Sequence, residues 1–178
     1  MFEVISAGSP ASLDALADAQ LILLDMGEGL VVPDLQISEG ETKWVARPGV
    51  SDFLMHYHKK EKPFVVFSDW DRDRVRGLVQ ELGWGDYLRL IFVGAEHVGH
   101  RHIYDAEGEK VVRSGHQKTL GRAFGHFRPF PHQRVFIGVE SDVNVFSCET
   151  YDTPLIVIPK EALDQSLEAR FSFRKLYR

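Results

Sequence analysis

Three short apolar runs of this chain each end in residues that could do chemistry. "LILL" runs into Asp25 in "LILLDMGEGL", "FVVF" into Ser68 in "SDWD", and "RVFI" into "GVESD". Continuous apolar runs of this length are typical of parallel strands buried on both faces. Because sites in such sheets form at the carboxyl ends of the strands, we expect these three ends to meet at one edge. Asp25 would act there either as a nucleophile or as a structural acceptor of backbone N–H groups.

The rest of the chain supplies the elements that would hold those ends in place. Strand-like and helical patterns alternate, which predicts an α/β fold with a mainly parallel sheet, in one domain over 1–178. Pro33 and Gly40 favour a loop or hairpin over 31–46, and Ser12 is a candidate N-cap for a short N-terminal helix. The expected strands are 21–24, 64–67, 87–94, 108–112, 134–139 and 154–159, and the expected later helices are 47–60, 71–82, 117–125 and 160–169.

Composition excludes several classes of function. The 178 residues carry 21 basic and 26 acidic side chains, a net charge of −5, which argues against a general nucleic-acid binder. The single cysteine, Cys148, excludes an internal disulfide and fits a reducing compartment. No apolar run is long enough for a membrane span. The first 20 residues contain no Lys or Arg, unlike a signal peptide or a mitochondrial presequence.

In chain order, "DMGEGL", "SDWD" and "GVESD" resemble motifs I, II and IV of the haloacid dehalogenase superfamily, which implies its three-layer Rossmannoid fold. The closer resemblance is to the FCP/SCP-like branch, the C-terminal-domain phosphatases or NIF domain. It extends over about residues 20–160. The matching positions are Asp25, Glu28 and Leu30 of a D-x-D-E-T-L pattern, Arg47–Val50 of R-P-G-V, Ser68, residues 118–120 of a K-D-L element, and residues 135–141 of motif IV.

The chain departs from this pattern where the family's chemistry is concentrated. Gly27 replaces the second aspartate of motif I, and Gly29 replaces the following threonine. Val139 stands at the first acid of motif IV, with Glu140 next to it. The resemblance implies that the missing aspartate is the general acid and base, a contribution of about 10²–10⁴-fold in rate. The sequence therefore predicts a pseudophosphatase that uses no cofactor.

Two alternatives stay open on the same residues. In a Mg²⁺-dependent phosphatase, the resemblance implies Asp25 as nucleophile and Mg²⁺ held by Asp25, the Gly27 carbonyl and Glu140. In a phosphate-ligand sensor without turnover, Ser68 would hold a phosphate oxygen and Lys118 would neutralise charge. Ser68 could instead cap the helix that follows it, and Lys118 could be a surface lysine.

A relative within the same branch points to protein partners. The mitochondrial inner-membrane presequence-translocase receptor has an altered motif I and uses the fold for protein binding. The order of a motif I loop and then "ETKWVARPGVSDFL" resembles that receptor, whose transmembrane anchor has no counterpart here. This resemblance implies other protein subunits as partners, with a mitochondrial location; without it, we expect a cytoplasmic one.

Two further segments carry candidate residues. "EHVGHRH", with Glu96, His97, His100 and His102, offers metal-type side chains, although zinc needs three or four ligands and solvated loop histidines explain the run as well. The basic, aromatic tail over about 170–178 would either dock a partner or pack on the domain itself. Its candidate partner-binding residues are Arg170, Phe171, Phe173, Arg174 and Tyr177.

Overall fold

A six-stranded parallel sheet forms the centre of the computed structural model, which describes residues 2–34, 43–93, 98–100, 103–104, 110–111, 116–118, 120–161 and 166–177. The predicted α/β architecture with a mainly parallel sheet is confirmed. In spatial order the strands are β1 (Val4–Ser6), β12 (Leu155–Ile158), β11 (Arg134–Val139), β2 (Leu21–Asp25), β5 (Phe64–Ser68) and β6 (Leu88–Val93).

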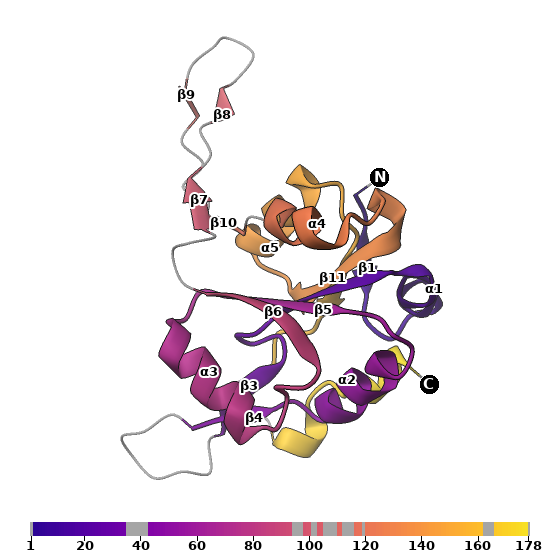
Figure 1. Cartoon of the computed structure of the whole chain (residues 1–178), viewed down its shortest axis with the longest axis vertical. Helices are drawn as coiled ribbons and strands as arrows, with labels where there is room; N and C mark the ends of the chain where they lie inside the picture. The colour runs from indigo at the N-terminus through magenta and orange to yellow at the C-terminus, as the bar shows by residue number, and fades with distance from the viewer. Residues whose placement is uncertain are drawn as a thin grey trace.

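Helices cover both faces of this sheet, so the fold has three layers. Figure 1 shows α4 and α5 on one side of the sheet and α2 and α3 on the other. The helices are α1 (Pro10–Asp18), α2 (Val50–His58), α3 (Arg72–Glu81), α4 (Gly121–Phe127) and α5 (Asp142–Thr150).

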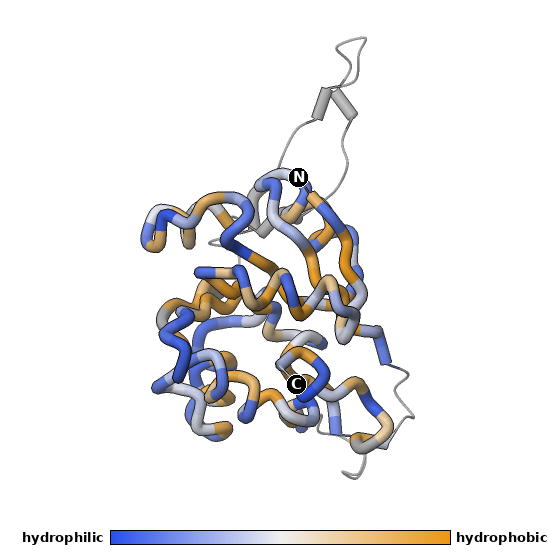
Figure 2. Tube along the Cα trace, turned by 90° about the vertical axis from the view of Figure 1, so that its right-hand side faces the viewer, coloured by the Kyte–Doolittle hydropathy of each residue, from blue (hydrophilic) through white to orange (hydrophobic). Residues whose placement is uncertain are grey.

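Alternation along the central strand builds two separate cores. Ile22 and Leu24 of β2 point into the cluster with α1, α2 and α3, whereas Leu21 and Leu23 point into the cluster with α4 and α5. In Figure 2 the apolar residues gather in the interior between these layers. All five residues of β2 are buried, as are all five of β5. This is why both strands appear in the sequence as unbroken apolar runs.

Three small two-stranded sheets extend from the central one. The predicted hairpin is present as β3 (Val31–Asp34) paired with β4 (Lys43–Ala46). Beyond β6, β7 (Val98–His100) pairs with β10 (His116–Lys118), and β8 (Ile103–Tyr104) with β9 (Lys110–Val111). Of these, β10 lies beside α5.

Several sequence predictions require correction. The N-terminal helix begins at Pro10 and its N-cap is Ser9, because the Ser9 hydroxyl accepts from the Ser12 backbone N–H. Residues 116–118 form a strand, so the helix expected from 117 begins at Gly121. The helix expected over 160–169 is replaced, where the chain is described, by a 3₁₀ turn at Leu167–Ala169. Further 3₁₀ turns occupy Pro131–Gln133 and Phe173–Leu176.

Candidate functional site

Asp25 lies at the carboxyl end of the central strand β2, between β11 and β5. Its side chain is buried, with 7% of the residue exposed. Ser68 ends the neighbouring strand β5, and Val139 ends β11 on the other side. The three strand ends singled out in the sequence therefore do lie along one edge of the sheet, as parallel pairing requires.

The chain reverses direction immediately after Asp25 in a very tight turn. The Gly27 carbonyl accepts from the Gly29 N–H at 2.6 Å, with Glu28 between them in the left-handed region at φ 55°. A three-residue γ-turn of this kind is strained for a residue with a side chain. A Cβ at Gly29 would lie 2.2 Å from the Asp25 carbonyl oxygen, so only glycine fits there. Gly29 is therefore a geometric requirement of this turn.

The buried Arg47 of the R-P-G-V segment holds that turn in place. Its Nε and Nη2 both donate to the Glu28 carbonyl, at 2.9 and 2.8 Å, and its Nη1 pairs with Glu161 at 3.1 Å. Burial lowers the pKa of Arg47, and the hydrogen bond and charge of Glu161 oppose that shift. Glu161 also accepts from the Phe171 N–H, so one carboxylate joins the turn to the C-terminal segment. The arginine of R-P-G-V is thus a structural clamp on the Asp25 turn.

Asn144, which the sequence reasoning missed, is the side chain that faces Asp25. It lies in the first turn of α5, is fully buried, and donates from Nδ2 to Asp25 Oδ2 at 2.9 Å. The same Nδ2 donates to the Val139 carbonyl at 2.9 Å. Because both partners are acceptors, the amide must present its NH₂ group here, and a flipped amide would bring oxygen against oxygen. The sequence signal for the start of this helix was Ser141, whose hydroxyl caps α5 by accepting from the Asn144 N–H.

Gly138 makes this contact between Asp25 and Asn144 sterically possible. A Cβ at Gly138 would lie 2.9 Å from Asn144 Nδ2 and 3.1 Å from Asp25 Cβ. Any other residue would push the two side chains apart. Gly138 therefore leaves the space in which Asp25 and Asn144 make contact.

The other predicted site residues take up different positions. The Ser68 hydroxyl is buried and accepts from the Trp70 N–H at 3.1 Å, which closes the turn before α3. Lys118 ends β10, in the small hairpin sheet beside α5 and outside the central sheet. Glu140 is exposed and is absent from the described lining of the hollow at Asp25.

A hollow of about 290 Å³ opens in front of Asp25, and we call it the Asp25 hollow. Trp44 of the hairpin and Trp70 before α3 form its aromatic wall, with ring centroids 4.6 Å apart in an edge-to-face pair. Arg74 of α3 stacks on Trp70 at 3.9 Å. The described lining residues are Asp25, Gly27, Glu28, Trp44, Asp69, Trp70, Val139, Ser141 and Val143.

These residues are a poor fit for a Mg²⁺ ion. Mg²⁺ requires near-octahedral oxygen ligands, usually one or two carboxylates together with water. Asp25 supplies one carboxylate, but Asn144 presents hydrogen-bond donors toward it and Val139 presents an apolar side chain. Within the described ranges, no group of three or more His, Cys, Asp or Glu side chains could hold a metal ion. Of the candidate residues in the histidine run, His100 lies in β7, and Glu96, His97 and His102 lie outside the described residues.

The aromatic C-terminal residues pack on the domain itself. Phe173 is fully buried against Phe53 at a centroid distance of 5.2 Å, and Phe171 is 8% exposed. Arg170 is buried and donates to the Pro33 carbonyl. Of the residues expected to bind a partner, Arg174 is exposed, near Asp52, and Tyr177 is half-buried. Phe171 and Phe173 therefore belong to the core, in agreement with the packing alternative.

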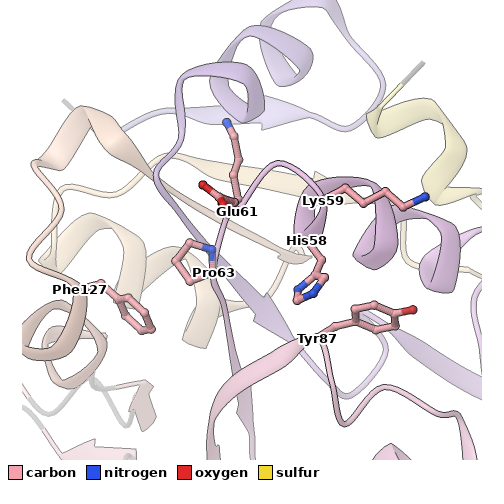
Figure 3. Close-up of a pocket in the computed structure, with 7 residues that line it drawn as sticks. His58, Lys59, Glu61, Pro63, Tyr87 and Phe127 are labelled. Atoms are coloured by element: carbon pink, nitrogen blue, oxygen red, sulfur yellow. The ribbon is translucent and has the colours of Figure 1, made fainter.

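A larger and more open hollow, of about 640 Å³, lies at the opposite edge of the sheet, where β5 and β6 begin. Figure 3 shows His58 beside Tyr87, with Phe127 across from them. Lys62 at its rim donates to the Leu16 and Ala17 carbonyls at the end of α1. None of the strand-end residues discussed above lines this hollow.

Solved structures of known proteins identify the fold of this chain. Comparison of the sequence with protein-family models and with curated proteins gives no match. Among solved structures, a hydrolase of the haloacid dehalogenase-like family from Streptococcus pneumoniae is similar, with a TM-score of 0.54, 12% identity and 90% of each chain covered. The chain therefore has the haloacid dehalogenase-like fold that its sequence predicts.

Two further structures bear on the extent of this similarity. The cobalt-bound deoxy-D-mannose-octulosonate 8-phosphate phosphatase from Haemophilus influenzae has a TM-score of 0.50 and 13% identity, covering 91% of this chain and 86% of its own. A 3-deoxy-D-manno-octulosonate 8-phosphate phosphatase from Moraxella catarrhalis has a TM-score of 0.44 and 13% identity, covering 72% of this chain. This chain spans only 62% of the length of that relative.

None of the helices in the described ranges is long and apolar enough to cross a bilayer.

Proposed function

We propose that this chain is a catalytically degenerate haloacid dehalogenase-like domain that serves as a protein-binding or structural subunit. The observation that carries this proposal is the Asn144 amide, whose NH₂ group is fixed between Asp25 Oδ2 and the Val139 carbonyl. The presumed nucleophile is thereby used as a hydrogen-bond acceptor in a buried structural contact.

Phosphoryl transfer by the family scheme needs a nucleophile, a general acid and base, and a Mg²⁺ ion. The general acid and base has no source here. Asp25 is retained. Gly27 cannot supply the general acid and base, and its carbonyl already accepts from Gly29. The Ser68 hydroxyl already accepts from the Trp70 N–H, which gives less support to a phosphate sensor at Ser68 and Lys118.

A Mg²⁺-dependent phosphatase is the second candidate, and Asp25 at the carboxyl end of the central strand is the observation that favours it. It would need Asn144 to turn away from Asp25 and Glu140 to turn inward. The names of two structural neighbours, a hydrolase and a phosphatase, also support this reaction class.

The likeness to the FCP/SCP branch and a place in a mitochondrial assembly are part of the proposal. Their support is the sequence "RPGV" together with Asp25, Glu28 and Leu30. Arg47 gives that support a physical basis, because its contacts with the Glu28 carbonyl tie the two motifs together.

The test is hydrolysis of 4-nitrophenyl phosphate with Mg²⁺ by the native chain, Asp25→Asn, Gly27→Asp and the double variant Gly27→Asp/Asn144→Asp. A Cβ at Gly27 would meet Trp70 at an ordinary 3.5 Å, so the aspartate can be introduced. We expect the native rate to equal that of Asp25→Asn and the double variant to exceed both by about 10²-fold or more. A robust native rate that Asp25→Asn abolishes would establish the phosphatase instead.

Thermal unfolding with and without Mg²⁺ at constant ionic strength tests Mg²⁺ binding independently of the rate assay. An ion that binds only the folded chain raises its melting temperature by mass action. We expect no Mg²⁺-dependent rise for the native chain and a rise for Asn144→Asp, in which two carboxylates would face each other.

A further inference from the structure

We infer that the hollow of about 640 Å³ at the amino edge of the sheet binds a mononucleotide-like molecule, with a planar ring, an N–H donor on that ring and an anionic tail. We call this cavity the amino-edge hollow. It is bounded by the turn over 59–63, by His58 and Tyr87, and by Phe127. It shares no described lining residue with the Asp25 hollow, so the inference goes beyond the proposed function and does not depend on it.

The framework of the domain holds the walls of the amino-edge hollow in place. The turn over 59–63 leads from α2 into β5, and the Lys62 ammonium fixes it by donating to two carbonyls at the end of α1, at 2.7 and 2.6 Å. The Pro63 carbonyl accepts from the Ile22 N–H of β2 at 3.1 Å. The volume lies within the range of about 300–1,000 Å³ that is typical of small-molecule sites. A ligand would therefore meet a preformed cavity of suitable size.

Aromatic rings line two of these walls. His58 and Tyr87 meet edge to face with ring centroids 5.3 Å apart, and Phe127 lies across the hollow from them (Figure 3). His58 is exposed, and Tyr87 and Phe127 are half-buried, so each ring keeps accessible surface. Aromatic side chains stack on any nucleobase, because every base has a π face. The walls therefore favour a planar ring over a sugar or an aliphatic acid.

Two side chains of opposite charge lie at opposite ends of the hollow. Figure 3 shows the Glu61 carboxylate on the side of Pro63 and the Lys59 ammonium extending the other way, on the side of Tyr87. Within the described part of the chain, neither Glu61 nor Lys59 forms an ion pair or a side-chain hydrogen bond. A carboxylate accepts N–H groups, and an ammonium binds a phosphate. A ligand with a donor on its ring and a phosphate at its other end would satisfy both.

The closing experiment titrates the full chain, without Mg²⁺, with adenosine 5′-monophosphate (AMP) and follows ring resonances by NMR. We expect saturable shifts for Tyr87 and Phe127. Adenosine, which lacks the phosphate, should bind about two- to five-fold more weakly, as expected for one partly solvated ion pair. Ribose 5-phosphate, which lacks the ring, should cause no saturable shift. The indole N–H resonances of Trp44 and Trp70 report on the Asp25 hollow and should stay unchanged.

Glu61→Gln tests the contact with the ring donor. It should weaken adenosine about two- to five-fold and leave purine riboside, which has no exocyclic amine, unchanged. Asp86→Asn, an exposed acid beside Tyr87 and outside the described lining, is the matched control and should alter neither affinity. A merely structural role for Glu61 would weaken both nucleosides equally.

Two further variants test the ring wall and the positive end. Phe127→Leu should weaken AMP about five-fold or more, whereas Phe124→Leu, half-buried on the same helix outside the described lining, should leave the affinity unchanged. Lys59→Gln should reduce the preference for AMP over adenosine, whereas Lys160→Gln, a 73%-exposed lysine outside the described lining, should keep it.

The inference fails if ribose 5-phosphate binds as well as AMP, if Tyr87 and Phe127 show no saturable shift, or if AMP shifts Trp44 and Trp70 instead. Tighter binding of a short oligoadenylate than of AMP would assign the hollow to nucleic acid and would also overturn it. These outcomes are independent of the phosphatase assay. A chain without turnover that ignores AMP would keep the proposed loss of catalysis, and a chain with Asp25-dependent turnover would overturn the proposed function whatever happens at the amino-edge hollow.

Discussion

Two adjoining regions of this molecule place a buried charged side chain in different surroundings. In the clamp region, Arg47 is joined to the Glu28 carbonyl and to Glu161, in an arrangement that only holds the chain together. In the Asp25 hollow, the Asp25 carboxylate accepts from the Asn144 amide and lines a cavity of about 290 Å³. The clamp matches the R-P-G-V pattern that the sequence resembles, whereas the hollow has Gly27 at the position of that pattern's second motif I acid. The comparison teaches that the R-P-G-V match is evidence for the fold of the Asp25 turn and not for its chemistry.

The largest effect should come from breaking the clamp with Arg47→Met. This variant keeps the apolar stem but leaves Glu161 and the strained Glu28 peptide without their buried cation. Removing one partner of a buried ion pair costs about 3–5 kcal/mol. We expect that loss in the free energy of unfolding from urea denaturation.

The matched control for the clamp is Lys160→Ala, which removes a 73%-exposed lysine 3.9 Å from the Glu28 carboxylate. It should change stability by less than about 1 kcal/mol. Equal losses for the two variants would mean that the Asp25 turn does not depend on Arg47.

Gly138→Ala tests the hollow side of the comparison. Its methyl group would lie 2.9 Å from Asn144 Nδ2 and from the ring of Phe136, both held in the core. Overpacking of this kind costs about 1–3 kcal/mol, and the Asn144 side-chain NH₂ resonances should shift as the contact with Asp25 opens. Gly77→Ala, in an open position on α3, should instead stabilise by about 0.5–1 kcal/mol. If Gly138→Ala were equally harmless, Asp25 and Asn144 would not be held as closely as described.

The two regions also differ in how far the sequence could reveal them. β2, β5 and β11 were predictable because burial on both faces leaves a continuous apolar run. β1 was missed because it has three residues in the burial pattern exposed, buried, exposed. α5 was missed because its apolar positions are interrupted by buried polar residues. Asn144 could not be predicted as the partner of Asp25, since that contact joins residues 119 apart through a space left by Gly138.

The C-terminal segment shows the same limit of prediction from sequence. Its basic and aromatic residues fitted two predictions equally well, a docking tail and a packed one. Local sequence could not decide between them, because Phe173 packs on Phe53 and the Leu176 carbonyl accepts from Tyr57, and both α2 residues lie more than 100 positions earlier. Only the assembled core distinguishes an aromatic residue that binds a partner from one that closes the domain.

The smallest predicted effect at neutral pH concerns that closure. The Tyr57 hydroxyl donates to the Leu176 carbonyl at 2.9 Å, and burial raises the pKa of Tyr57 to about 12. At pH 7, Tyr57→Phe should therefore cost only about 1 kcal/mol, the net value of one hydrogen bond.

In the unfolded chain a tyrosine ionises near pH 10, so the folded state favours the neutral phenol. The stability that this group contributes is complete below about pH 10 and is lost as the pH rises toward 12. The free energy of unfolding of the native chain should thus fall more steeply than that of Tyr57→Phe between pH 10 and 12. Parallel curves would show that the Tyr57 hydroxyl is solvated and that the C-terminal segment is held by its apolar contacts alone.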